Sequence, residues 1–222
     1  VSTRIVPSAA IIDPELTLTL PHKVTAASGV DAFTHCVESF VNPNSSALSE
    51  LYSVQGMELI AGSLRRVCEE GSDLAARSDM ALGSHYGGVC LTSAGAGAIH
   101  ALAYPLGSRF HIPHGVSNSL MFSHVMKVNY PANPEKFARI AAILGEDIAS
   151  LSIEEAAERS VGAVERLCKD CGVPTQLSEV DVPAHVIPEL AEAAFETQQR
   201  LLGFNPKKLT LEDIEKIYRA AA

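Results

Sequence analysis

Charged side chains, and basic ones above all, are scarce in this sequence of 222 residues. Only 19% of the residues are charged and 47% are hydrophobic, a composition that excludes a disordered chain and provides for a buried core. Lysine and arginine number 17 against 26 acidic residues, which gives a formal net charge of -9. Because this charge repels phosphate groups and anionic lipid surfaces, we expect neither a nucleic-acid partner nor a membrane partner.

The five cysteines are odd in number and irregularly spaced, in a chain too long to be a disulfide scaffold. We therefore expect reduced thiols and a cytoplasmic location. Cys168 and Cys171 form a single C-x-x-C motif, which is typical of redox or zinc sites when a strand precedes it or a second pair accompanies it. Neither condition is met, so the motif favours an ordinary helix end.

The sequence begins Val-Ser-Thr-Arg, with no initiator methionine and no signal peptide. We expect the chain to begin inside a longer protein. The stretch from Met80 to Ser108 contains no Asp, Glu, Lys or Arg and exceeds the roughly 20 residues that a bilayer requires. Its glycines, histidines and hydroxyl groups predict a close-packed pair of buried helices instead.

Helix signals dominate the sequence after an extended start. An Asp13-Pro14 turn and Leu-Thr alternation over residues 16–20 predict β or extended backbone. We therefore interpret residues 1–22 as an extended interdomain lead-in. Residues 23–222 are interpreted as an all-helical metal-binding domain. No strand-helix alternation and no glycine-rich phosphate loop is present, so the predicted fold class is mainly α without a dinucleotide fingerprint. Caps and breaks predict helices at about 23–40, 46–70, 72–93, 97–106, 116–129, 134–145 and 152–172, and a last one from 210.

Asp31 and His35 are four residues apart on a predicted helix, so their side chains project from one face at neighbouring turns. His100 lies within the uncharged stretch, where a buried imidazole needs a partner and a ligand bond is one of the few ways to supply it. His114 follows in a Pro-His-Gly loop that can return to the same place. One carboxylate and three imidazoles suit Fe(II), Zn(II), Mn(II) or Co(II), so we predict a metal site; the alternative is that these are ordinary core and surface residues.

Several motifs follow one another in a characteristic order: Asp13-Pro14-Glu15-Leu16-Thr17; Ser28-Gly29-Val30-Asp31-Ala32-Phe33-Thr34-His35 with Glu38; Gly97-Ala98-Ile99-His100-Ala101-Leu102-Ala103-Tyr104-Pro105-Leu106-Gly107; and His111-Ile112-Pro113-His114-Gly115-Val116-Ser117-Asn118. In this order and spacing the sequence resembles the iron-containing (group III) alcohol dehydrogenase family over nearly its whole length. The resemblance implies the C-terminal helical domain of such an enzyme, a dehydroquinate synthase-like α domain. It also implies that an N-terminal Rossmann-like domain is absent from this chain.

The resemblance implies that Asp31, His35, His100 and His114 are the metal ligands, which is the set that the spacing also selects. It implies Fe(II), with Zn(II) as the alternative metal, and NAD or NADP bound mainly by the absent domain. A Lewis-acidic metal polarises the alcohol or carbonyl oxygen in that chemistry while hydride passes to or from the nicotinamide. The implied substrate is a small-molecule alcohol, aldehyde or ketone. We also expect a homo-oligomer. A helical domain without its partner domain exposes an apolar face, so this chain should self-associate or be less stable than its composition suggests.

Other candidate residues have two interpretations each. Tyr104 stands where many family members have a further histidine, so it is a candidate catalytic residue. An unperturbed tyrosine has a pKa of about 10 and is a poor proton relay, so the alternative is that Tyr104 only shapes the pocket. His111 is the alternative catalytic candidate, unless it only bonds backbone in its loop. Leu16 and Leu20 are candidate cofactor-binding residues beside the nicotinamide, or they pack at the domain junction. Glu38 is either a hydrogen-bond acceptor for a ligand imidazole or part of a solvated helix face.

Three functions therefore compete. The leading hypothesis is an NAD(P)-dependent alcohol dehydrogenase or aldehyde/ketone reductase, of which this chain is the metal-binding domain and is inactive by itself. The second is a relative on the same fold, such as a maleylacetate reductase or a polyol dehydrogenase. The third is a non-catalytic helical interaction module in which the four residues only pack.

Overall fold

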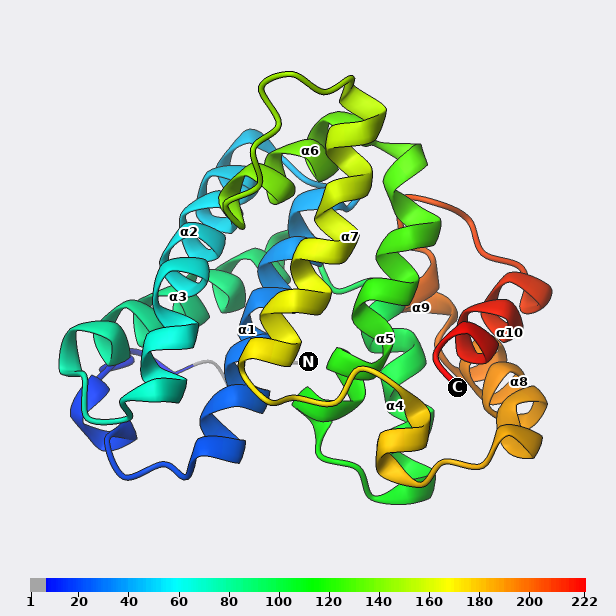
Figure 1. Ribbon diagram of the computed structural model, residues 1–222, viewed down its shortest axis with the longest axis horizontal. Helices are drawn as coiled ribbons and strands as arrows, with labels where there is room; N and C mark the ends of the chain where they lie inside the picture. Colours follow the sequence, from blue (N-terminus) through cyan, green and yellow to red (C-terminus); the bar gives the residue numbers. More distant parts are fainter. Residues whose placement is uncertain (1–6) are drawn as a thin grey trace.

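The computed structural model describes residues 7–222, and within them the chain forms α-helices and short 3-10 turns with no strand (Figure 1). This confirms the mainly α prediction. The α-helices are α1 (His22–Val41), α2 (Ala47–Glu69), α3 (Leu74–Ser93), α4 (Ala98–Phe110), α5 (His114–Asn129), α6 (Pro134–Ile143), α7 (Ile153–Asp170), α8 (Ile187–Thr197), α9 (Gln199–Leu202) and α10 (Leu211–Ala220). The 3-10 turns are η2 (Pro14–Thr17), η3 (Tyr130–Ala132), η4 (Leu177–Val180) and η5 (Ala184–Val186).

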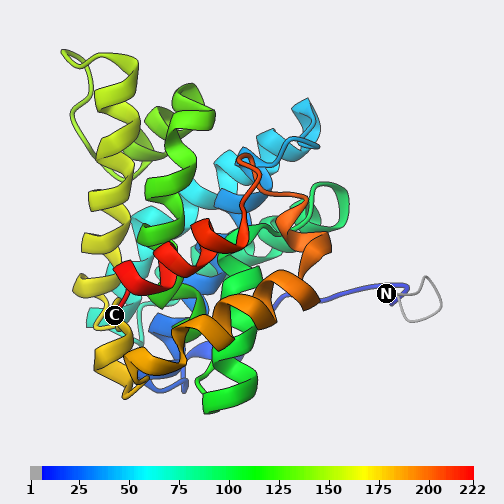
Figure 2. The ribbon, with the colours of Figure 1, turned by 90° about the vertical axis from the view of Figure 1, so that its right-hand side faces the viewer.

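Helix α1 lies at the centre of the bundle because most of its surface is apolar and buried. It packs against α2 and α3 on one side and against α5 on the other (Figure 1). Helices α8 and α10, near the C-terminus, cover α4 and α5 and face the viewer in Figure 2. Burial of these apolar faces is the main source of stability in such a bundle. The arrangement brings the middle of α1 next to the beginnings of α4 and α5.

Local capping sets most helix boundaries close to those predicted. Ser46 caps α2, and the capping boxes of Ser152 with Glu155 and of Thr210 with Asp213 both form. Helix α3 differs, because its N-cap is Asp73 rather than Ser72: the Asp73 carboxylate accepts the backbone N–H of Ala76 at 2.9 Å.

The ends of α4 and α5 also differ from the prediction. Helix α4 continues past Pro105 and ends at Phe110, and its C-cap His111 adopts the left-handed conformation with φ of 56°. Histidine is among the residues that enter this region more readily than most. Helix α5 begins at His114, two residues earlier than expected, so this histidine belongs to a helix and not to a loop.

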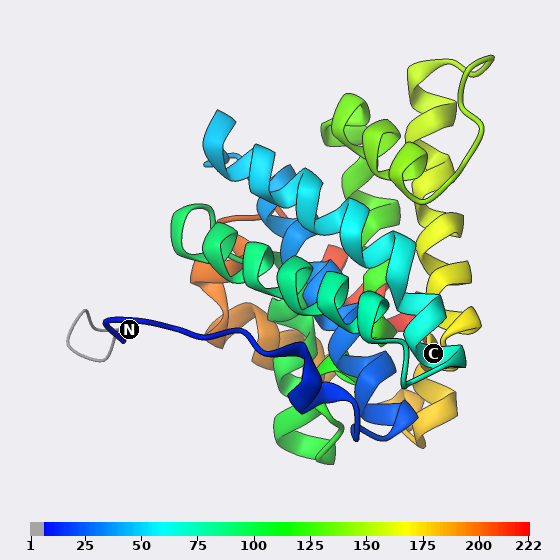
Figure 3. The ribbon, with the colours of Figure 1, turned by 90° about the vertical axis from the view of Figure 1, so that its left-hand side faces the viewer.

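The extended backbone predicted for the lead-in is wrong at Pro14–Thr17, which forms the 3-10 turn η2. The Asp13 carboxylate accepts the backbone N–H of Glu15 at 3.0 Å, and the Thr17 hydroxyl donates to the carbonyl of Pro14 at 2.7 Å. Proline also has the fixed φ of a first helical position, so these local bonds outweigh the Leu-Thr alternation. The described part of the lead-in runs beside α3, which η2 contacts, before α1 begins (Figure 3). The part of this prediction that falls on residues 1–6 lies outside the described residues.

The uncharged stretch corresponds to α3 and α4. No single helix within residues 7–222 is long and apolar enough to cross a bilayer; α3 and α4 meet the length and composition limits only together, and they are bent by 103° at the break between them. Helix α4 is buried over most of its length, as predicted. Helix α3 is buried on one face only, where Gly83 approaches α2 so closely that a Cβ would lie 2.7 Å from Ile60 Cγ1.

Candidate metal centre

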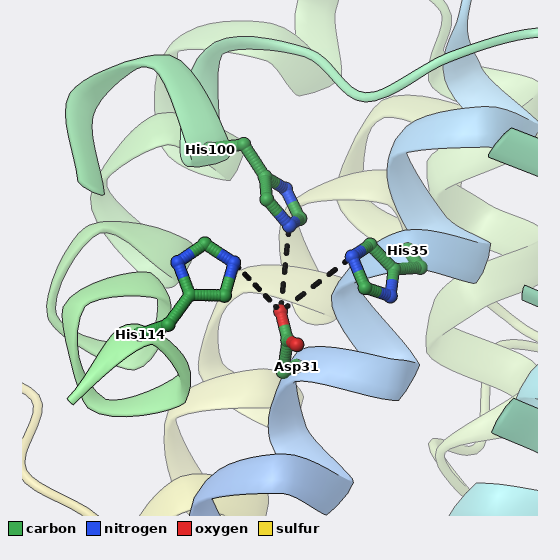
Figure 4. Close-up of side chains that lie close together, drawn as sticks. All are labelled: Asp31, His35, His100 and His114. Atoms are coloured by element: carbon green, nitrogen blue, oxygen red, sulfur yellow. Dashed lines mark ion pairs between the residues drawn. The ribbon is translucent and has the colours of Figure 1, made fainter. Parts of the chain in front are cut away.

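The structure brings Asp31, His35, His100 and His114 together at one point of the bundle (Figure 4). Asp31 and His35 lie one turn apart on the same face of α1, as their spacing predicts. His100 is in the first turn of α4, and His114 is the first residue of α5. Each residue offers one ligand atom, and these atoms all lie within 4.8 Å of one another.

The three imidazoles surround one oxygen of the Asp31 carboxylate. Its Oδ1 is 3.3 Å from Nε2 of His100, 3.6 Å from Nε2 of His114 and 3.7 Å from Nε2 of His35. The last two distances are too long for hydrogen bonds. Ligands bonded at about 2.1 Å to one tetrahedral ion lie roughly 3.4 Å apart, so this donor set fits a shared cation of the Zn(II) or Fe(II) type.

Burial differs sharply among the four residues. The His100 side chain is fully buried, whereas that of His114 is 43% exposed, so the centre opens toward solvent on the side of α5. Burial acts to raise the pKa of the Asp31 carboxyl, but a hydrogen bond with His100 and the charges of the three imidazoles hold this pKa below its ordinary value. Burial lowers the pKa of His35.

The pKa of His100 shifts in the opposite direction to that of His35. Burial acts to lower its pKa, but the carboxylates of Glu38 and Asp31 outweigh it and raise the pKa to about 9. The surroundings of this imidazole therefore favour a positive charge on it. A metal ion bound at Nε2 of His100 would supply that charge in place of a proton.

Glu38 is not on a solvated helix face, since it is only 4% exposed. Its Oε2 lies 2.6 Å from Nδ1 of His100, and its Oε1 accepts the backbone N–H of Ile99 at 2.6 Å. The interpretation as an acceptor for a candidate ligand imidazole is the one that the structure confirms. Its sequence signal is position: Glu38 stands two helical turns after Asp31 and so lies on the same face of α1.

Asn118 is a further polar residue of the centre, to which the sequence analysis gave no role. Its Nδ2 donates to Asp31 Oδ1 at 2.6 Å and lies 3.2 Å from Nε2 of His100 and 3.3 Å from Nε2 of His114. Its Oδ1 is the one buried side-chain polar atom in the described part of the chain that has no hydrogen-bond partner. The available signal was again spacing, because Asn118 follows His114 by one helical turn on α5.

Of the two candidate catalytic residues, Tyr104 contacts one of the clustered histidines. Tyr104 is 45% exposed and its ring stacks on that of His114, with centroids 5.6 Å apart and planes 26° from parallel. His111 is exposed at the end of α4, and its backbone N–H bonds the carbonyl of Gly107 at 3.0 Å. Within residues 7–222 no hydrogen bond or ion pair joins the His111 side chain to the four clustered residues.

The two candidate cofactor-binding leucines are on the lead-in. Leu16 is exposed, and Leu20 lines a cavity of about 430 Å³ between the lead-in, α1 and α3. Ser28 and Ala32, which flank Asp31 on α1, line the same cavity. The cavity thus connects Leu20, but not Leu16, with the neighbourhood of the centre.

The C-x-x-C motif forms an ordinary helix end, as predicted. Cys168 is in the last turn of α7 and Cys171 is its C-cap, and both are buried. Burial raises the pKa of the Cys168 thiol to about 12, which leaves it unreactive. All five cysteines are free thiols.

Comparison with known proteins identifies the family. Residues 25–222 match the model of the Fe-containing alcohol dehydrogenase family, C-terminal. The chain is 39% identical over 221 residues to the 1,3-propanediol dehydrogenase of Klebsiella pneumoniae, covering 100% of this chain and 57% of that protein. It is 42% identical over 212 residues to the long-chain-alcohol dehydrogenase 1 of Geobacillus thermodenitrificans, covering 96% of this chain and 53% of that protein.

The same relationship holds for a solved structure. A crystal structure of a 1,3-propanediol oxidoreductase matches with a TM-score of 0.96 at 39% identity, over 100% of this chain and 58% of that one. The chain belongs to the Fe-containing alcohol dehydrogenase family, as the sequence resemblance implied, and has the fold of its C-terminal helical domain. It spans little more than half the length of the curated relatives that it matches.

Proposed function

We propose that this chain is the metal-binding catalytic domain of an NAD(P)-dependent alcohol dehydrogenase or aldehyde/ketone reductase, with Asp31, His35, His100 and His114 as the metal ligands. The observation that carries this proposal is the convergence of four ligand atoms within 4.8 Å in a chain of this family. Fe(II) is the first candidate and Zn(II) the second, because one carboxylate and three imidazoles suit both ions. The substrate is a small-molecule alcohol, aldehyde or ketone.

A bound divalent metal supplies Lewis acidity at the alcohol or carbonyl oxygen while hydride passes between the substrate and the nicotinamide. The residues of this chain hold and shape that site. Asp31 provides a negative charge among three imidazoles, and Asn118 orients its carboxylate by donating to Oδ1. The exposed side of His114 leaves access for substrate from the direction of Tyr104.

The residues around the centre have supporting roles in this proposal. Tyr104 forms a wall of the open side by stacking on His114, and the exposed His111 is the alternative candidate for proton transfer. Leu20 contributes apolar surface beside the nicotinamide from the cavity next to Asp31. The lead-in, residues 1–22, joins the helical domain of residues 23–222 to a nucleotide-binding domain outside this chain. We place the protein in the cytoplasm as a homo-oligomer.

Metal content tests the ligand assignment. The protein is reconstituted anaerobically with Fe(II) or Zn(II) and analysed for bound metal, alongside a His100→Ala, His114→Ala double variant. We expect about one equivalent in the parent and almost none in the variant. The matched control replaces two exposed histidines away from the centre, His22→Ala with His185→Ala, and should keep the metal. Equal metal in the parent and the His100, His114 variant would contradict the proposal.

Substrate profiling separates the competing reactions. The full-length enzyme is assayed with NAD and with NADP on simple alcohols, polyols and maleylacetate. Turnover of primary alcohols supports the leading proposal, and turnover restricted to maleylacetate or polyols supports the second candidate. A protein that folds identically without metal and turns over none of these substrates would instead be an interaction module.

A further inference from the structure

Glu38 is a carboxylate buried in the bundle, one turn beyond His35 on α1. A carboxylate removed from water is tolerated only when its oxygens are paired and hydrogen-bonded. Each oxygen has its own partner: Oε2 lies 2.6 Å from Nδ1 of His100, and Oε1 accepts the backbone N–H of Ile99 at 2.6 Å. The carboxylate therefore bridges the backbone and the side chain of two consecutive residues of α4.

The bond to Ile99 anchors the start of α4. This helix begins at Ala98, and its N-cap residue, Gly97, has no side chain to cap it. Glu38 takes the place of the cap from another helix, because it accepts a free N–H of the first turn and brings negative charge to the positive end of the helix dipole. Gly97 gives it room, since a Cβ there would lie 3.2 Å from Glu38 Oε1. The placement of the turn that carries His100 thus depends on Glu38.

The bond to His100 decides which ring nitrogen faces the centre. We assign the donor role to Nδ1 of His100, with Glu38 Oε2 as the acceptor 2.6 Å away, so that Nδ1 carries a hydrogen. Nε2 is then the nitrogen left to ligate, and it lies 3.3 Å from Asp31 Oδ1. No hydrogen bond or ion pair in the described part of the chain joins Glu38 to Asp31, His35 or His114. Its direct hydrogen bond to the cluster is therefore the one to His100.

We propose that Glu38 is a positioning residue of the metal centre: by bridging the His100 ring and the Ile99 amide, it fixes the tautomer of His100 and the position of α4, so that Nε2 is presented to the ion. This inference rests on the proposed function, because it requires the clustered residues to bind a metal. It adds a residue that holds a ligand without being one. Partners of this kind contribute about 10-fold to 100-fold to metal affinity in other proteins.

Co(II) is the probe for the test, because its visible absorption reports on the ligands as well as on binding. The protein is titrated with Co(II) against a competing chelator, as parent, Glu38→Gln and Glu38→Asp. We expect about 10-fold to 100-fold weaker binding in Glu38→Gln, with a shifted visible band. Glu38→Asp keeps the charge but is one methylene shorter, so we expect an affinity between those of the parent and Glu38→Gln.

Two further variants keep the outcomes distinct. Glu179→Gln removes the charge of a capping carboxylate outside the cluster, one that accepts the backbone N–H groups of Thr175 and Gln176, and it should leave Co(II) binding unchanged. His100→Ala removes a ligand and should abolish tight binding. If His100→Ala binds Co(II) as the parent does, the proposed function fails. If His100→Ala loses Co(II) while Glu38→Gln binds it normally with an unchanged band, the role of Glu38 alone is overturned.

If Glu38→Gln does not fold, a measurement on the parent protein tests the tautomer of His100 directly. In the Zn(II)-loaded protein, ¹⁵N spectra of the histidine rings are expected to show a hydrogen on Nδ1 of His100 and a bond to zinc through Nε2. A His100 ring with its hydrogen on Nε2, or one that binds zinc through Nδ1, would overturn the proposal.

Discussion

Gly115 and Ala27 are in backbone contact where α5 meets α1: a Cβ built on Gly115 would lie 2.1 Å from the carbonyl oxygen of Ala27. Gly115 follows His114 directly, and Ala27 lies one helical turn before Asp31. This contact therefore sets the separation of the two helices at the point where each contributes to the metal centre. Only glycine permits so close an approach.

Gly115→Ala is accordingly expected to push α5 away from α1. The clash is with backbone, which cannot rotate aside, so we expect a loss of about 1–3 kcal/mol in the free energy of unfolding and weaker binding of Zn(II) by the shifted His114. Denaturant unfolding and metal titration measure the two effects. Gly62→Ala on α2 is the matched control: nothing lies within 4 Å of its Cβ position, and it should stabilise the protein by about 0.5–1 kcal/mol. Equal behaviour of the two variants would contradict the interpretation.

The sequence could predict most of the candidate centre because its signals are short-range. The i,i+4 spacing of Asp31 and His35 is fixed by helix geometry, and a histidine in a long uncharged stretch must be buried. What brings α4 and α5 to α1 is long-range packing such as the contact of Gly115 with Ala27, and no local pattern shows it. Glu38 stayed ambiguous for the same reason, since its partners lie on another helix.

In the fold, too, short-range features could be predicted and long-range ones could not. The capping box of Thr210 with Asp213 could be predicted from the sequence because both of its bonds are local. Helices α8 and α9 were not delimited, because neither has a side-chain cap that marks its start. At Pro14–Thr17 the alternation of leucine and threonine suggested extended backbone, but a single Asp13 cap was enough to form a turn.

Tyr218→Phe is expected to destabilise the fold without affecting the centre. The Tyr218 hydroxyl donates to the backbone carbonyl of Leu102 at 2.5 Å, and both residues are fully buried. Phenylalanine keeps the packing but removes this one hydrogen bond, while the Leu102 carbonyl keeps its place inside α4, so we expect a loss of about 0.5–1.5 kcal/mol. Chemical denaturation should show this loss while metal content stays at that of the parent. Tyr52→Phe, at a half-buried tyrosine on α2, should change stability by less than about 0.5 kcal/mol.

The thiols should divide into one reactive cysteine and four protected ones. Cys68 alone is partly exposed, and a hydrogen bond from Cys171 lowers its pKa, whereas Cys36, Cys90, Cys168 and Cys171 are buried. Titration of the native protein with a thiol reagent should therefore show one rapid equivalent, and five after unfolding. Cys68→Ser should remove the rapid equivalent. A second rapid equivalent in that variant would show that a buried thiol is accessible.

His124 should make the protein less stable as the pH falls. This side chain on α5 lies with Nε2 3.3 Å from the carbonyl oxygen of Thr175, and burial lowers its pKa below the ordinary value of 6.5. As the pH drops through 6.5, His124 becomes protonated in the unfolded chain but stays neutral in the folded chain, so the free energy of unfolding decreases. The loss continues until the pH reaches the folded-state pKa.

His124→Gln tests this dependence, because glutamine can donate to the same carbonyl and does not titrate. The decrease in the free energy of unfolding between pH 7 and pH 5 should be smaller in the variant than in the parent. His35, whose pKa burial also lowers, contributes to both proteins alike and cancels in the comparison. An NMR titration of His124 in the folded parent should give a midpoint below 6.5. A midpoint at or above that value, or equal pH dependence in the two proteins, would mean that the folded state accommodates the charged imidazole.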